Sequence, residues 1–126
     1  MIPMTNTTRL ASWVTAVNVL VASGFSVAGL INPASILPPG ASPNEASSLF
    51  AMYAAARTIP LAVAVLVAVY KRSVPALLVL GALAGAVQLL DAIIGVFRND
   101  PQKVIGPLVL GILQFYAVFR LQRASR

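Results

Sequence analysis

A run of 25 residues, Ala46–Tyr70, constrains the fold of this chain most, because it contains a single charged residue, Arg57. At about 1.5 Å per residue, a helix of this length spans a bilayer hydrocarbon core of about 30 Å. Ser42 as the helix cap and Glu45 three residues later form a helix-start signature ahead of the run. Pro60 removes a backbone hydrogen bond beside the charge and predicts a kink there. The run therefore predicts a membrane-spanning helix with an arginine near its middle.

Three further runs have the same character. The chain has 126 residues, of which 59% are hydrophobic and 10% charged, whereas soluble domains carry about 25% charge. Short connections make neighbouring helices antiparallel. We predict an all-α fold, a transmembrane four-helix bundle that forms a single integral membrane domain over residues 1–126. The expected spans are 10–31, 46–70, 74–97 and 102–121.

The first run has a second interpretation as a cleavable signal peptide, because Ser26-Val27-Ala28 resembles a small-residue cleavage site. The apolar run is long for a signal peptide, however, so we predict a span.

The chain is basic, with nine Lys and Arg against three Asp and Glu. These cations cluster between the apolar runs, which indicates membrane orientation and not nucleic-acid binding. The side of the membrane with more cations is the cytoplasmic one. We therefore predict an inner-membrane protein with both termini in the cytoplasm and loop 32–45 outside. Six cations fall on the cytoplasmic side, Arg9, Lys71, Arg72, Arg120, Arg123 and Arg126, and two on the other, Arg98 and Lys103.

Cysteine and histidine are absent from the chain. A disulfide, a thiol nucleophile, a histidine-ligated haem and a Ser–His triad are thereby excluded, and a zinc site is not expected. We predict no cofactor and no metal site. Only carboxylates, Arg, amides, hydroxyls and Tyr remain for chemistry.

Six polar residues fall at comparable depths when residues are counted from the outer ends of the spans. Arg57 and Asp91 differ by about 7 Å along the helix axis, which a long arginine side chain bridges. We expect one polar layer in the outer half of the bundle. Its members are Asn18, Tyr53, Arg57, Gln88, Asp91 and Gln114.

Ionisable residues inside a membrane mark functional sites by default. The candidate catalytic residues are Asp91, which would move a proton, Arg57, which would hold a carbonyl or carboxylate, and Tyr53, which would orient the ligand. The candidate ligand-binding residues are Asn18, Gln88 and Gln114. A structural role remains open, because amides also join membrane helices and a buried Arg–Asp pair can simply fix register.

Small residues recur at helical spacing in two of the spans, which predicts close packing between helix backbones. The first stripe is Asn18, Ala22, Ser26 and Gly29, and the second is Gly81, Gly85, Gln88, Ala92 and Gly95.

Three short motifs resemble the DoxX-like group of small four-helix bacterial membrane proteins: Asn32-Pro33, Ala56-Arg57 and Asp91. Several members of that group carry an acidic residue directly after the arginine, where this chain has Thr58. The resemblance implies a four-helix bundle and, in some members, a subunit of a redox or quinone-linked complex.

Three functions are open at this stage. The leading hypothesis is a site for a lipophilic small molecule at an Arg57–Asp91 polar centre, with isomerase, hydrolase or cyclase chemistry as an undecided extension. The alternative is a non-catalytic subunit of a larger membrane complex, or a homo-oligomer. A small proton-coupled exporter ranks last, because a carboxylate neutralised by arginine is a poor proton carrier. The lipid bilayer is the expected partner in all three cases.

Overall fold

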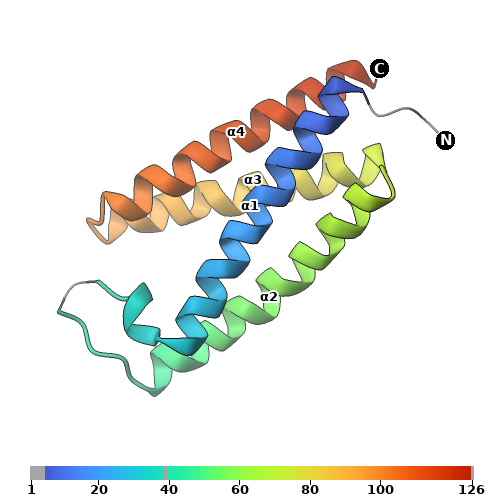
Figure 1. Cartoon of the computed structure of the whole chain (residues 1–126). Helices are drawn as coiled ribbons and strands as arrows, with labels where there is room; N and C mark the ends of the chain where they lie inside the picture. The colour runs from blue at the N-terminus through green and yellow to red at the C-terminus, as the bar shows by residue number, and fades with distance from the viewer. Residues whose placement is uncertain (1–4, 39, 126) are drawn as a thin grey trace.

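The computed structural model describes residues 5–38 and 40–125. These residues form four long helices, α1 (Asn6–Ile31), α2 (Glu45–Tyr70), α3 (Val74–Phe97) and α4 (Gln102–Ala124), with a short 3₁₀ helix, η1 (Pro33–Ile36), after α1 (Figure 1). Each long helix is long and apolar enough to cross a membrane. The predicted all-α, four-helix membrane architecture is confirmed.

Local sequence explains where the helices begin. The Thr5 hydroxyl accepts a hydrogen bond from the Thr8 amide, 3.2 Å away, at the start of α1. At α2 the expectation of Ser42 as the cap is wrong. Asn44 fills this position, because its side chain accepts from the Ser47 amide while the Ser47 hydroxyl accepts from the Asn44 amide, both at 2.8 Å. This reciprocal pair satisfies two backbone donors, which a lone serine further upstream does not.

The connections α2–α3 and α3–α4 are tight. In each, one residue adopts a left-handed backbone conformation, Arg72 and Asn99, both with φ of 53°. The next amide then bonds back to the helix, from Ser73 to the Ala68 carbonyl and from Asp100 to the Gly95 carbonyl, both at 3.0 Å. These bonds satisfy terminal carbonyls and reverse the chain within a few residues.

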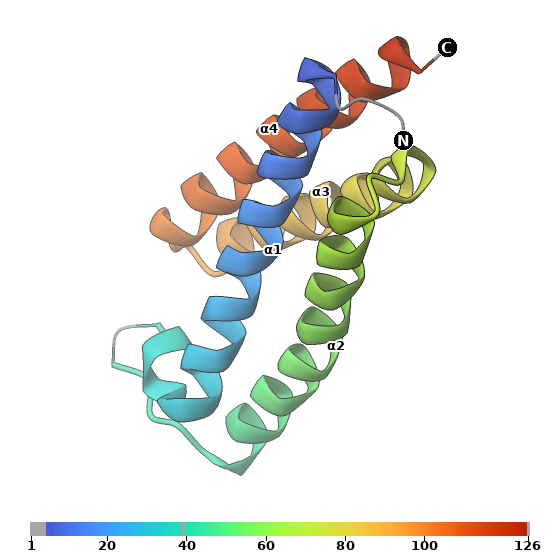
Figure 2. The ribbon, with the colours of Figure 1, turned by 45° about the vertical axis from the view of Figure 1, so that its right-hand side comes forward.

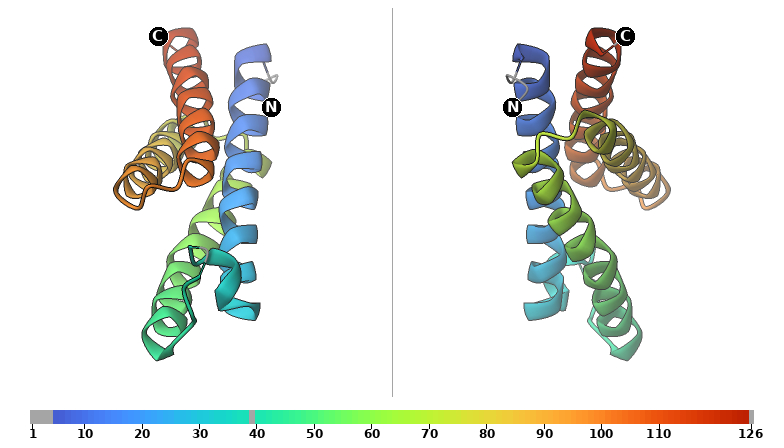
Figure 3. Two further views of the ribbon diagram at one scale, coloured as in Figure 1. Left: turned by 90° about the vertical axis from the view of Figure 1, so that its left-hand side faces the viewer. Right: turned by 90° about the vertical axis from the view of Figure 1, so that its right-hand side faces the viewer.

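The four helices are arranged as two hairpins, α1–α2 and α3–α4, which cross each other (Figures 1 and 2). We call the end at which α1 begins, α4 ends and α2 turns into α3 the terminal end. The end at which α1 ends, α2 begins and α3 turns into α4 is the loop end. The hairpins lie together toward the terminal end and diverge toward the loop end (Figure 3). We call the space between α2 and α3 on this diverging side the wedge.

Glycines bring α3 and α4 into close contact along their length. A Cβ atom on Gly95 would lie 2.7 Å from the Lys103 carbonyl oxygen, and one on Gly81 would lie 2.7 Å from Val118 Cγ2. Such small-residue contacts let helix backbones approach each other in lipid. All five residues of the predicted α3 stripe are buried, namely Gly81, Gly85, Gln88, Ala92 and Gly95.

The apolar core lies in the middle of the bundle and at its terminal end. One cluster comprises Ala11, Ala68, Leu77, Ala117 and Leu121. A second cluster, nearer the crossing of the hairpins, comprises Val19, Ala62, Val65 and Ala84. The helix surfaces outside these clusters are strongly apolar, with Phe25 exposed by 68% and Leu90 by 60%. A surface of this kind, on helices of this length, contacts the lipid bilayer.

Candidate functional site

The buried polar centre of the molecule is a chain of hydrogen bonds between three helices. Gln88 Nε2 of α3 donates to Asn18 Oδ1 of α1 at 2.6 Å. Asn18 Nδ2 donates to Gln114 Oε1 of α4 at 3.0 Å. Gln114 Nε2 in turn donates to the Thr15 hydroxyl of α1 at 2.8 Å. We call these four residues the amide network.

All four members are almost fully enclosed, with exposed fractions between 0% and 4%. Polar groups at this burial are stabilised only when they bond to one another, because lipid and apolar side chains offer no alternative partner. The network contains no carboxylate, amine or imidazole, so it has no group suited to proton transfer near neutral pH. Its hydrogen bonds hold the two hairpins together.

Gly81 leaves space for the side chains of the amide network. A Cβ atom at this position would lie 2.9 Å from Gln114 Nε2 and 3.6 Å from the Thr15 hydroxyl. The glycine stripe of α3 therefore positions the buried glutamine as well as the α4 backbone.

The structure unites three of the six predicted site residues, Asn18, Gln88 and Gln114, and leaves the other three outside. Tyr53 is 50% exposed, and Arg57 and Asp91 are exposed as well. Across residues 5–38 and 40–125, no charged side chain is buried and no ion pair joins Arg57 to Asp91. The expected Arg–Asp centre of one polar layer therefore has no support.

Arg57 binds to its own helix instead. Its Nη1 donates to the Tyr53 carbonyl oxygen at 3.0 Å, and the guanidinium lies 5.5 Å from the centroid of the Tyr53 ring. The side chain thus turns back one helical turn toward the loop end. A cation over an aromatic face is stabilised by the ring quadrupole, which offsets part of its desolvation.

A second polar contact joins α1 to α2 nearer the loop end. The Ser26 and Thr58 hydroxyls lie 2.7 Å apart, and Thr58 also bonds to the Ala54 carbonyl of its own helix. Because Thr58 has one hydroxyl proton, which it gives to Ala54, Ser26 is the donor between the helices. Thr58 is the residue at which the chain departs from the DoxX-like pattern. In this structure its hydroxyl links α2 to α1.

Sequence reasoning missed Thr15 and the Ser26–Thr58 contact. Thr15 lies three residues before Asn18 and thus on the same face of α1, a spacing that predicts a shared neighbour. Thr58 directly follows Arg57, and its partner Ser26 belongs to the predicted small-residue stripe of α1. The position of Thr15 relative to Asn18, and the place of Ser26 in the stripe, were therefore the signals that could have predicted these contacts.

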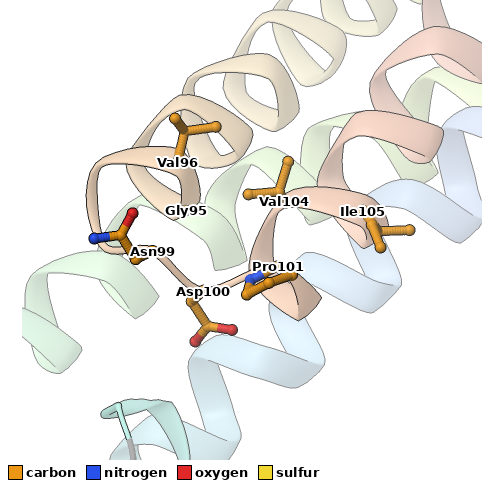
Figure 4. Close-up of a pocket in the computed structure, with 7 residues that line it drawn as sticks. All are labelled: Gly95, Val96, Asn99, Asp100, Pro101, Val104 and Ile105. Atoms are coloured by element: carbon orange, nitrogen blue, oxygen red, sulfur yellow. The ribbon is translucent and has the colours of Figure 1, made fainter.

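Two surface hollows on the described part of the chain contain no predicted site residue. The larger, about 450 Å³, is open and lies at the α3–α4 turn, where Gly95, Asn99 and Asp100 line it (Figure 4). Its acid is engaged locally, with Asp100 Oδ2 lying 3.7 Å from Lys103 Nζ. The smaller, about 250 Å³, lies at the terminal end beside Arg9, Ser12 and Trp13. Both hollows are set apart from the amide network.

Comparison of the chain with protein-family models, with curated proteins and with solved structures gives no match in any of the three. The resemblance to the DoxX-like group therefore rests on the short motifs alone.

Proposed function

We propose that this protein is an interaction subunit, whose helices assemble in the bilayer with other transmembrane helices through the wedge. The observation that carries this proposal is the exposure of Arg57 and Asp91 within the spans. The other charged residues of the four spans lie close to the ends of the helices, whereas Arg57 and Asp91 lie further inside. A charge left in lipid costs about 3 kcal/mol on the most lenient scale. Partner helices that cover these side chains remove that cost.

The small-molecule hypothesis has less support. Its polar residues fall into two groups, because Asn18, Gln88 and Gln114 bond to one another while Arg57 and Asp91 are exposed elsewhere. The amides are fully engaged in holding helices, and so they offer little to a ligand. The DoxX-like group, which the chain resembles, includes subunits of redox or quinone-linked complexes, in line with an assembly role.

The experiment compares particle mass in native membranes. The full chain is extracted with its surrounding lipid by a membrane-solubilising polymer, and its mass is measured. We expect particles well above those of a single 13.1 kDa chain. Arg57→Leu with Asp91→Leu should release the single chain.

The matched control is Phe25→Ala with Leu90→Ala, which alters exposed apolar side chains and should leave the particle mass unchanged. A wild-type chain that emerges from native membranes alone would overturn the proposal.

The orientation of the chain is part of the same proposal. The excess of cations at the terminal end supports cytoplasmic termini, with residues 32–44 on the far side. Because the chain has no cysteine, Ser42→Cys and Ser125→Cys provide single labelling sites. An impermeant thiol reagent applied to intact cells should label the first and not the second, and the reverse pattern would invert the orientation.

A further inference from the structure

Arg57 lies on the same side of α2 as Leu61, one turn further along the helix. Leu61 packs against the cluster in which Val65 of α2 meets Val19 of α1 and Ala84 of α3. Residues four apart share a helix face. Arg57 therefore lies on the same face of α2 as Leu61, but nearer the loop end, where α3 has diverged from α2.

Asp91 occupies the equivalent position on α3. It lies seven residues, about two turns, beyond Ala84 of the same core cluster and one turn from the buried Gln88. The stripe that packs against α2 and α1 near the crossing thus ends on a carboxylate toward the loop end. Helical periodicity thus directs Arg57 and Asp91 toward the wedge from opposite helices.

The two charges also lie at similar distances from the loop ends of their helices. The guanidinium turns back to Tyr53, which lies eight residues from the start of α2 at Glu45. Asp91 lies six residues before the end of α3 at Phe97. Both groups are therefore about 9 to 12 Å from the loop ends of their helices.

Closure of the wedge within one chain is opposed by the contacts that hold the hairpins. The amide network fixes the crossing of α1 over α3 and α4. The Ser26–Thr58 contact holds α2 against α1 toward the loop end. An intrachain Arg57–Asp91 pair would have to distort one of these polar contacts, and such contacts are costly to break in lipid.

We infer that the occupant of the wedge is a second copy of this chain, so that Arg57 of each copy pairs with Asp91 of the other. This inference rests on the proposed function and names its partner. A two-fold axis along the bilayer normal keeps every residue at its own depth and creates both pairs at once. One copy is complementary to a second, because each presents one cation and one anion at similar distances from the loop ends of their helices.

Cross-linking tests the reciprocal pairs directly. Arg57→Cys carrying one affinity tag is coexpressed with Asp91→Cys carrying another, and membranes are treated with a short bismaleimide. In the mixed dimer one pair is replaced by the two thiols and the other pair stays intact. We expect a cross-linked product of twice the chain mass that carries both tags.

Controls define the outcomes. Arg57→Cys paired with Arg123→Cys, a cation at the terminal end, should give no product. Both substitutions placed in one chain should give the dimeric product. A product that stays at the mass of one chain would show closure of the wedge and overturn the inference.

Association of the purified chain in lipid nanodiscs tests the energetics. Arg57→Leu should weaken dimerisation about tenfold or more, which corresponds to about 1.4 kcal/mol, and Arg57→Asp with Asp91→Arg should restore it. Arg123→Leu should leave it unchanged.

The two proposals fail differently. A chain that is monomeric in nanodiscs but part of a larger particle in native membranes overturns the second copy and leaves the interaction subunit standing. A chain that is monomeric in both overturns both.

Discussion

The terminal and loop ends of this bundle contain similarly apolar helices, yet only toward the terminal end do the two hairpins pack together. Both apolar clusters lie at the crossing or on its terminal side. Lipid tails are as apolar as leucine, so hydrophobicity alone gives membrane helices little reason to associate. Close approach through small residues and hydrogen bonds between amides decide where they meet. The face of α3 that packs against α1 and α2 shows the difference, since it presents Ala84 near the crossing and Asp91 toward the loop end.

Within the α3–α4 hairpin, the two helices stay close together as far as the loop end, where Gly95 lies against the Lys103 backbone. Gly95→Leu would drive a side chain into the Lys103 backbone, which lies 2.7 Å from an added Cβ and cannot rotate away. We expect a loss of about 3 kcal/mol in the free energy of unfolding, measured by denaturation in mixed micelles.

Gly106→Leu is the matched control, because an added Cβ there has nothing within 4 Å. Equal losses in the two variants would show that close approach does not hold this hairpin together.

The amide network divides the packed half from the open half, so its removal should weaken the packing of the hairpins. Asn18→Leu leaves Gln88 and Gln114 without their shared partner, and we expect a loss of about 2 kcal/mol in the free energy of unfolding. Replacing all three by leucine should cost less than the sum of the single changes, because no buried amide is then left unpaired.

Gln122→Leu alters an exposed amide of α4 and serves as the control, with an expected change within about 0.5 kcal/mol. Additive effects of the three network substitutions would argue against a connected network.

The smallest expected effect concerns the fastening of α1 to α2. Thr58→Val and Ser26→Ala each remove one side of the interhelical contact, and a double-mutant cycle should give a coupling energy of about 0.6 kcal/mol. Hydrogen exchange should accelerate in the loop-end half of α2 and stay constant in its terminal half. Equal acceleration of hydrogen exchange along all of α2 would show that the contact does not act on the loop-end half alone.

Sequence reasoning found the helices because hydropathy and length decide whether a segment spans the bilayer. The predicted third span, 74–97, coincides with α3, and the second differs from α2 by one residue. Depth counting brought Asn18, Gln88 and Gln114 together, since a rise per residue converts position into depth. It failed for Arg57 and Asp91, because depth does not fix the crossing of the hairpins, and the crossing decides which faces are covered.

The hydrogen bonds of Asn18 have a consequence for synthesis of the chain. Its amide partners lie 70 and 96 residues later in the sequence. At rates of translation of about 5 to 20 residues per second, Gln114 is made about 5 to 20 s after Asn18. During that interval the Asn18 side chain of α1 lacks its hydrogen-bond partner Gln114. A chain whose synthesis stops after α2 therefore leaves a hairpin in which Asn18 lacks both of its amide partners, and this distinguishes it from the finished protein.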